Sequence, residues 1–155
     1  MNNNDYFTLK GYVQKDHNEL SYAMEDYLEM ICRSCSSNQF IRVNDLATRL
    51  NVTPPSVSKM MTKLKDLGYI EFEPYGMIKP TLKGWELGKY FLKRHNVINE
   101  FFKVVNNSVN EFEITEKIEH FLDQRTVRNM ERCIPEMKHT LGKLHTTTDQ
   151  SMEEK

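Results

Sequence analysis

The sequence predicts a mainly α-helical fold in two parts, and three observations support this prediction. Two helical stretches joined by a short turn precede an alternating hairpin pattern within residues 21–81, long amphipathic patterns fill residues 82–141, and the prolines 54–55 and Gly68 fall at helix ends. At 155 residues the chain is one domain or two small ones sharing an interface, which excludes a large multidomain enzyme.

The first predicted helix follows an Asn-rich arm over residues 1–20. Ser21 is placed to cap a helix that runs from Tyr22 through residue 35. Helical spacing puts four side chains on one stripe for burial: Ala23, Tyr27, Met30 and Ile31.

Two further helices joined by a tight turn come next. After a short extended stretch over residues 40–43, Asn44 is expected to cap the helix over residues 45–50. The turn at residues 51–53 leads into Pro54 and Pro55, which the first turn of a helix tolerates, and this third helix continues to Gly68.

Residues 69–79 alternate like a hairpin, with strands over 69–73 and 77–79 and a turn at 74–76. A long amphipathic helix then begins at residue 82 and ends at residues 106–108, followed by helices over 110–122 and 125–139 and a flexible tail over 142–155. The candidate buried positions of the long helix are Leu82, Trp85, Leu87, Phe91, Leu92, Val97, Ile98, Phe101 and Phe102.

Helix, turn, helix and hairpin in this order are typical of a winged helix-turn-helix, whose second helix enters the major groove of DNA. The distribution of charge also favours DNA binding. Residues 41–94 hold ten Lys and Arg against five Asp and Glu, although the whole chain has a net charge of -1. The same small fold also occurs as a plain interaction module. The predicted DNA contacts are Arg42, Thr53, Pro55, Ser56, Ser58, Lys59, Thr62, Lys63 and Lys79, with Val57, Met60, Met61 and Leu64 on the buried face of the third helix.

Acidic and imidazole side chains gather on three of the predicted helices. Asp26 and Glu29 are three residues apart on the first, His95 lies on the long helix, and Glu116, Glu119 and His120 share one face of the next. If the three faces converge, four carboxylates in one pocket would repel one another unless divalent cations balanced them. Carboxylate and imidazole donors without a thiolate suit manganese or Fe(II) better than zinc or copper.

The three cysteines do not indicate a disulfide framework. Cys32 and Cys35 lie on one predicted helix and are expected to be buried thiols, and Cys133 is expected in the core. No stretch is apolar for the roughly 20 residues of a membrane span, and the first residues lack an export signal. We therefore expect a cytoplasmic protein with no membrane partner.

Residues 21–140 resemble the diphtheria toxin repressor family of metal-dependent regulators, particularly its manganese transport regulators. The most specific segments are MEDYLE, PPSVSKM, KRH and IEH, in family order and spacing. The resemblance implies a homodimer, an N-terminal winged-helix domain over 21–81, a helical dimerisation domain over 82–141, and a metal corepressor. It implies ligand roles for Asp26, Glu29, His95, Glu116, Glu119 and His120.

Two positions in this resemblance favour manganese, since the iron-responsive branch usually has Met where this chain has Asp26, and Cys where it has Glu116. One position departs from it: relatives often have Glu four residues after His95, where this chain has Asn99, with Glu100 about 100° further around the helix.

The sequence therefore predicts a non-enzymatic, manganese-responsive repressor of metal-ion uptake genes that binds double-stranded operator DNA and takes no organic substrate. Mn(II), one or two per protomer, is the expected corepressor, with Fe(II), Co(II) or Cd(II) as other candidates. The alternatives are an iron-responsive repressor of the same family, a di-metal carboxylate enzyme in a helical bundle, and a regulator that senses an organic ligand or redox state through Cys32 and Cys35. The enzyme alternative lacks the paired Glu-x-x-His motifs typical of such bundles.

Overall fold

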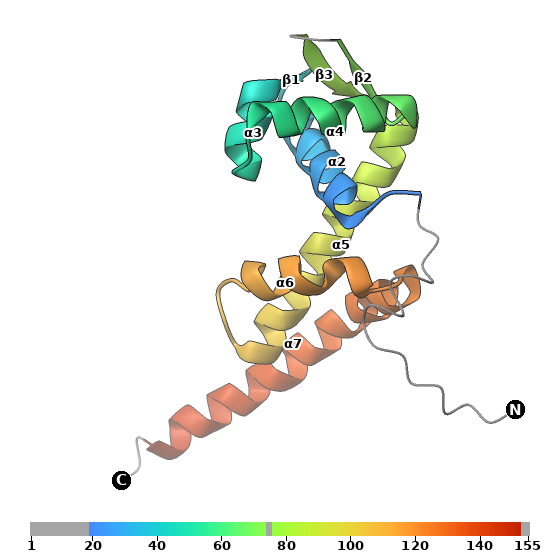
Figure 1. Ribbon diagram of the computed structural model, residues 1–155. Coiled ribbons are helices and arrows are strands. Elements are labelled where there is room, and N and C mark those ends of the chain that lie inside the picture. Colours follow the sequence, from blue (N-terminus) through green and yellow to red (C-terminus); the bar gives the residue numbers. More distant parts are fainter. Residues whose placement is uncertain (1–18, 74–75, 153–155) are drawn as a thin grey trace, which may run out of the picture.

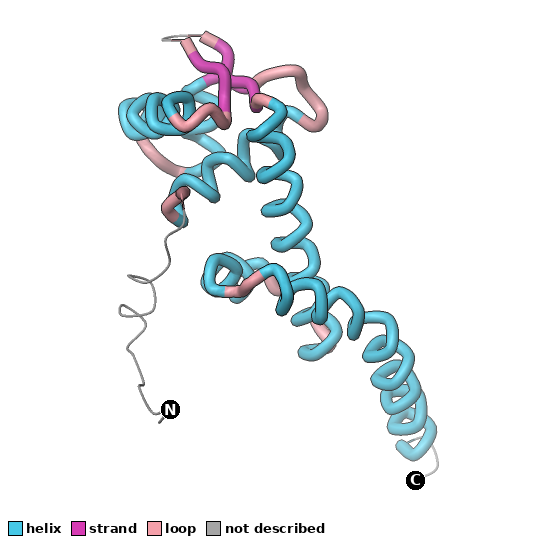
Figure 2. The backbone as a smooth tube through the Cα atoms, turned by 90° about the vertical axis from the view of Figure 1, so that its right-hand side faces the viewer, coloured by secondary structure: helices cyan, strands magenta, loops and turns pink. Residues whose placement is uncertain are grey.

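The computed structural model describes residues 19–73 and 76–152, with side chains described to residue 141, and these residues form two lobes (Figure 1). The N-terminal lobe holds α2 (Tyr22–Cys35), β1 (Ile41–Arg42), α3 (Val43–Leu50), α4 (Pro54–Asp66), β2 (Ile70–Phe72) and β3 (Met77–Pro80). The C-terminal lobe holds α6 (Phe112–Ile118), the 3₁₀ helix η1 (Glu119–Phe121) and α7 (Gln124–Met152). The long helix α5 (Leu82–Asn106) runs from the sheet down into the C-terminal lobe (Figure 2).

The mainly helical, winged helix-turn-helix fold is confirmed. Residues 1–18 of the expected arm lie outside the described part of the chain. None of the described helices combines the length and apolar character that a bilayer crossing requires.

Helix α2 begins where Ser21 accepts a hydrogen bond from the Met24 amide at 3.4 Å, as predicted. Its buried stripe contains Met24, Tyr27, Leu28, Ile31 and Cys32. Ala23 was expected on this stripe, but it is exposed because it lies about 100° from Met24 around the helix.

The helix-turn-helix consists of α3, a left-handed Asn51 (φ 53°) and α4, whose first two residues are the prolines expected there. Gly68, with φ +77°, follows the end of α4. The predicted cap at Asn44 is wrong. Arg42 occupies the N-cap position of α3 instead, without a side-chain capping hydrogen bond, because the pairing of β1 with β3 holds Arg42 extended and the helix starts directly after it.

The predicted hairpin forms β2 and β3, and the extended residues before α3 add a third strand. The antiparallel order is β1-β3-β2, with Ile78 opposite both Ile41 and Phe72. These three side chains are buried, so the wing is anchored in the core of the N-terminal lobe.

Helix α5 packs closely against α2 through glycine. Thr81 caps α5 by accepting from the Gly84 amide at 3.1 Å, and a Cβ at Gly88 would lie 2.2 Å from Cys32 Sγ. Leu82 was expected to be buried but is 77% exposed, because it is the first residue of α5 and burial begins only at Gly84.

The C-terminal lobe has a small core of its own. Val97, Ile98 and Val127 are buried, with Phe102, Ile118, Leu122, Met130 and Ile134 packed around them. Cys133 was expected in this core, but it is exposed because it lies about 100° from Ile134 around α7.

Two expectations for the C-terminal lobe are corrected. The helix predicted over 110–122 is α6 followed by the tighter turn η1, because Leu122 is extended and Asp123 caps α7 by accepting from the Thr126 amide at 2.7 Å. The helix expected over 125–139 continues through residues 142–152, which belong to the predicted tail. They contain no proline, and extending an existing helix is easier than nucleating one.

Replacing Gly88 with alanine should lower the free energy of unfolding by about 1–3 kcal/mol, because the new methyl group overlaps Cys32 Sγ. Urea denaturation measures this cost. The same substitution should cost less in a Cys32→Ala background, where Sγ is absent, and an equal cost in both backgrounds would contradict the proposed overlap.

Candidate metal centre and nucleic-acid interface

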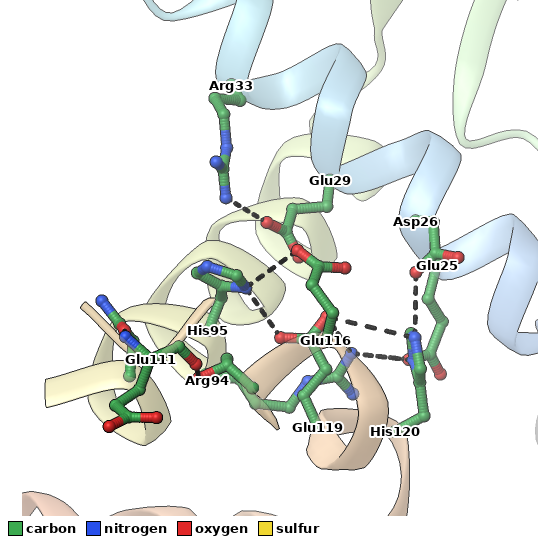
Figure 3. A network of polar contacts seen from close by, with 12 residues as sticks. Glu25, Asp26, Glu29, Arg33, Arg94, His95, Glu111, Glu116, Glu119 and His120 are labelled. Carbon is green, nitrogen blue, oxygen red and sulfur yellow. Dashed lines mark hydrogen bonds and ion pairs between the residues drawn. The ribbon is translucent and has the colours of Figure 1, made fainter. Parts of the chain in front are cut away.

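The predicted metal ligands meet where α2 approaches α5, α6 and η1 (Figure 3). Potential ligand atoms form two groups, Asp26 with Glu119 and His120, and Glu29 with His95 and Glu119, and within each group these atoms all lie within 4.8 Å of one another. We call them the outer triad and the inner triad; both contain Glu119. Five of the six predicted ligands are therefore neighbours although they come from distant parts of the chain.

The inner triad is almost closed to solvent. His95 Nδ1 lies 3.0 Å from Glu119 Oε2, and these side chains are 3% and 1% exposed. The hydrogen bond with Glu119 is the main cause that raises the pKa of His95. Burial, followed by the nearby charge of Glu119, raises the pKa of Glu29, although Arg33 pairs with Glu29 at 2.5 Å.

Glu116, the sixth predicted ligand, lies at the rim of the inner triad. Its Oε1 is 3.5 Å from His95 Nδ1, and its side chain is 60% exposed. Burial and the charge of Glu119 raise the pKa of Glu116. Glu116 therefore faces the site without belonging to either triad.

The outer triad is centred on His120, whose Nε2 lies 2.9 Å from Asp26 Oδ1 and 4.0 Å from Glu119 Oε1. Burial, the largest influence, lowers the pKa of His120, but hydrogen bonds with Asp26 and Glu25 outweigh it and raise this pKa to about 9. The acids around the imidazole thus favour a positive charge in the outer triad.

The donor atoms fit a divalent cation. Desolvation raises the pKa values of Glu29 and Glu116, which marks a crowded acidic site that a cation would stabilise. The cysteines of α2 contact other parts of the structure: Cys32 Sγ approaches Gly84 O at 3.6 Å, and Cys35 Sγ approaches Ile78 O at 3.9 Å. The donors are therefore oxygen and nitrogen, without thiolate.

Asn99 and Glu100, which follow His95 on α5, make contacts outside the triads. Asn99 Oδ1 accepts from the Glu111 amide at 2.9 Å. Glu100 pairs with Lys103 at 2.9 Å and with Lys138 of α7 at 2.6 Å. Both side chains are therefore engaged outside the triads.

Two charged residues at this junction were not among the predicted ligands. Glu25 and Arg94 are 7% and 4% exposed, and they form an ion pair with Arg94 Nη2 2.8 Å from Glu25 Oε2. The feature of the sequence that could have identified them is their position next to predicted ligands: Glu25 precedes Asp26 in MEDYLE, and Arg94 precedes His95 in KRH.

The predicted DNA contacts lie on one side of α4 and along the wing. Thr53, Pro55, Ser56, Lys59, Thr62 and Lys63 are exposed, Ser58 is half-buried, and Val57, Met61 and Leu64 are fully buried on the opposite side of α4. Arg42 is exposed and Lys79 half-buried. Between α4 and the wing lies a groove of about 570 Å³ lined by Arg42, Pro54, Pro55, Ser58, Thr62 and Phe72, among others.

This face has the charge expected for phosphate contacts. Lys59, Lys63 and Arg42 make no ion pair with any residue that the structure describes, which leaves their charges available. The hydroxyls of Thr53 and Ser56 lie 2.9 Å apart at the start of α4.

Comparison with known proteins gives concordant results. Residues 19–78 match the family described as iron dependent repressor, N-terminal DNA binding domain. The HTH-type transcriptional regulator MntR of Oceanobacillus iheyensis is 35% identical over 106 residues, covering 68% of this chain and 72% of that protein. MntR of Listeria monocytogenes serovar 1/2a is 30% identical over 138 residues, covering 84% of this chain and 97% of that protein.

Solved structures agree on the fold. The manganese regulator SloR superposes with a TM-score of 0.63 at 24% identity, covering 72% of this chain and 53% of SloR. IdeR of T. acidophilum superposes with a TM-score of 0.59 at 22% identity, covering 68% of this chain and 51% of IdeR. The chain spans about half the length of these two structures.

The thiols of α2 should react slowly with iodoacetamide in the native protein at pH 8. Burial raises the pKa of Cys32 to about 12 and also raises that of Cys35, so both remain protonated, and the thiolate is the nucleophile. Mass spectrometry of digested protein measures alkylation at each cysteine. Denatured protein is the control, in which all three should react, and rapid alkylation of native Cys32 would contradict the described packing.

Proposed function

The chain belongs to the diphtheria toxin repressor family of metal-dependent DNA-binding repressors, which also contains the MntR regulators, and we propose that it is a manganese-responsive repressor of metal-ion uptake genes. This family consists of transcriptional regulators rather than enzymes, so the di-metal enzyme alternative is set aside. As a regulator of transcription it would act in the cytoplasm.

The main support for metal control is that the donor atoms come from both lobes. Asp26 and Glu29 lie on α2 of the N-terminal lobe, whereas Glu119 and His120 lie on η1 of the C-terminal lobe. His95 comes from α5, which runs between the lobes (Figure 1). Because the donors belong to both lobes, the state of this site affects how the lobes are held relative to each other.

Manganese is the proposed corepressor because the donors are hard. Asp26 and Glu116 supply carboxylates where the iron-responsive branch is expected to carry sulfur, and carboxylate suits Mn(II) better than thiolate does. A bound divalent cation would supply positive charge against the four carboxylates of Asp26, Glu29, Glu116 and Glu119. Two triads that share Glu119 are consistent with one or two ions per protomer. Fe(II), Co(II) and Cd(II) are the other candidate ions, because they can bind the same donor atoms.

Helix α2 is the element that would pass this effect to the DNA-binding face. Its acidic side carries the donors, while its buried stripe lies in the same core as Val57, Met61 and Leu64 of α4. A change in the angle between α2 and η1 therefore also moves α4 relative to the C-terminal lobe. Regulation would follow from a shift in the populations of these arrangements.

A second copy of the chain is the proposed partner of the C-terminal lobe. The lobe has few fully buried residues, and Val105, Val109, Phe112 and Ile114 are exposed on its surface. A homodimer would present two α4 helices to major grooves about 34 Å apart, or a multiple of that spacing, on double-stranded operator DNA.

Operator affinity should rise about 5- to 150-fold when Mn(II) is added, the usual range of coupling between two binding sites. Fluorescence polarisation on labelled promoter DNA of a metal-ion uptake gene, with Mn(II) or with chelator, measures this change. Glu119→Gln is the matched variant, because it removes the carboxylate shared by both triads and should abolish the response. Operator binding that is insensitive to Mn(II) and chelator would refute the proposal.

Changing Lys59→Ala should weaken binding to all DNA sequences and lower the slope of log affinity against log salt by about 1, because one phosphate contact is lost. The affinity for Mn(II) should stay unchanged, because Lys59 is exposed on the surface of α4 and belongs to neither triad. Polarisation titrations at several salt concentrations measure the slope, and a folded variant with wild-type DNA affinity would contradict this role for Lys59.

A further inference from the structure

The buried pair of Glu25 and Arg94 belongs to neither triad, although it lies directly beside the outer one. Arg94 Nη2 is 2.8 Å from Glu25 Oε2, and the guanidinium carbon lies 4.8 Å from the centre of the Phe91 ring. Burying two charges carries a desolvation penalty that their attraction does not always repay. Their further contacts therefore indicate what else the pair does.

The closest of those contacts are with one nitrogen of His120, and Arg94 Nη2 also lies 3.9 Å from Glu119 Oε1. The Glu25 oxygen that pairs with Arg94 also lies 2.9 Å from His120 Nδ1, and Arg94 Nη2 lies 3.2 Å from the same nitrogen (Figure 3). The Tyr22 ring stacks on the imidazole at 5.1 Å with an interplanar angle of 19°, which restricts the tilt of the ring. Glu25 and Arg94 thus contact the ring nitrogen that faces away from the triad, while Tyr22 covers one face of the ring.

The other ring nitrogen faces the donors. His120 Nε2 lies 2.9 Å from Asp26 Oδ1, within the outer triad. A neutral imidazole carries its hydrogen on one nitrogen and its lone pair on the other. If Nδ1–H donates to Glu25, the lone pair is on Nε2 and points into the triad; if Nε2–H donates to Asp26, Nδ1 accepts from Arg94 and the lone pair points away.

We propose that Glu25, fixed by Arg94, is a positioning residue that accepts the hydrogen of His120 Nδ1 and so directs the Nε2 lone pair into the outer triad. Carboxylates behind metal-binding histidines act in this way in other proteins. Glu25 is not counted among the ligands, because it belongs to neither triad and its Oε2 already contacts both Arg94 and His120. The inference rests on the proposed function, in which the triads bind Mn(II).

The test is a double-mutant cycle on the full chain, with Mn(II) affinity measured from the electron paramagnetic resonance signal of free Mn(II). Glu25→Ala should weaken binding about 10- to 100-fold, the usual effect of losing such a partner. In a His120→Ala background the same change should alter affinity by less than about twofold, because Glu25 acts through His120. Equal losses in both backgrounds would show that Glu25 acts otherwise and would overturn the inference.

Two further variants separate positioning from charge. Glu25→Gln keeps a carbonyl oxygen that Arg94 orients and that still accepts from Nδ1–H, so it should retain more affinity than Glu25→Ala. Glu100→Ala removes a carboxylate that pairs with Lys103 and Lys138 on the other side of α5, and it should leave affinity unchanged. A Gln variant as weak as the Ala variant would indicate that only the charge of Glu25 matters and would overturn the inference.

Nitrogen NMR of ¹⁵N-histidine protein loaded with Cd(II) provides a readout of the tautomer itself. The wild-type chain should show a His120 Nδ1–H that exchanges slowly with water, and Glu25→Ala should lose this protection. An identical Nδ1–H signal in both proteins would overturn the inference while leaving the proposed function intact. A wild-type chain that binds no Mn(II) would instead overturn the proposed function itself, and this inference with it.

Discussion

The burial of the Glu119 carboxylate at the junction of the two lobes is the constraint on which the rest of the structure depends. Glu119 is 1% exposed, and a buried carboxylate is stable only with opposite charge or hydrogen-bond donors beside it. His95 at 3.0 Å and Arg94 at 3.9 Å, both on α5, provide them. Because α2 brings Asp26 and Glu29 to the same place, acidic side chains from both lobes meet at this junction.

On the side away from the acidic junction, α2 packs closely against α5 and the wing. Cys32 lies against Gly88 of α5 so tightly that no Cβ fits there, and Cys35 reaches the wing strand at Ile78. A packed contact of this kind moves as a unit rather than deforming. The acidic junction and the DNA-binding face are therefore linked by one rigid helix, which is what a metal-controlled repressor requires.

The elements of the fold followed from local pattern, and so did most of the donor set. Capping at Ser21, the prolines at the start of α4 and the alternation over residues 69–79 all depend on near neighbours, and these predictions are confirmed. Some errors have distant causes, because pairing of β1 with β3 moved the start of α3. Others are local: the helix expected over 110–122 changes to the 3₁₀ turn η1 at Glu119 and ends at the extended Leu122.

Sequence alone identified the candidate metal-binding side chains, because helical spacing decides which residues share a face, and that spacing is a property of a few consecutive residues. Only the tertiary structure decided which of those faces meet. It placed His120 beside Glu25 across 95 positions and left Glu116 at the rim while burying Glu119. It also identified the pair of Glu25 and Arg94, since burial of a charged side chain depends on packing between helices far apart in the chain.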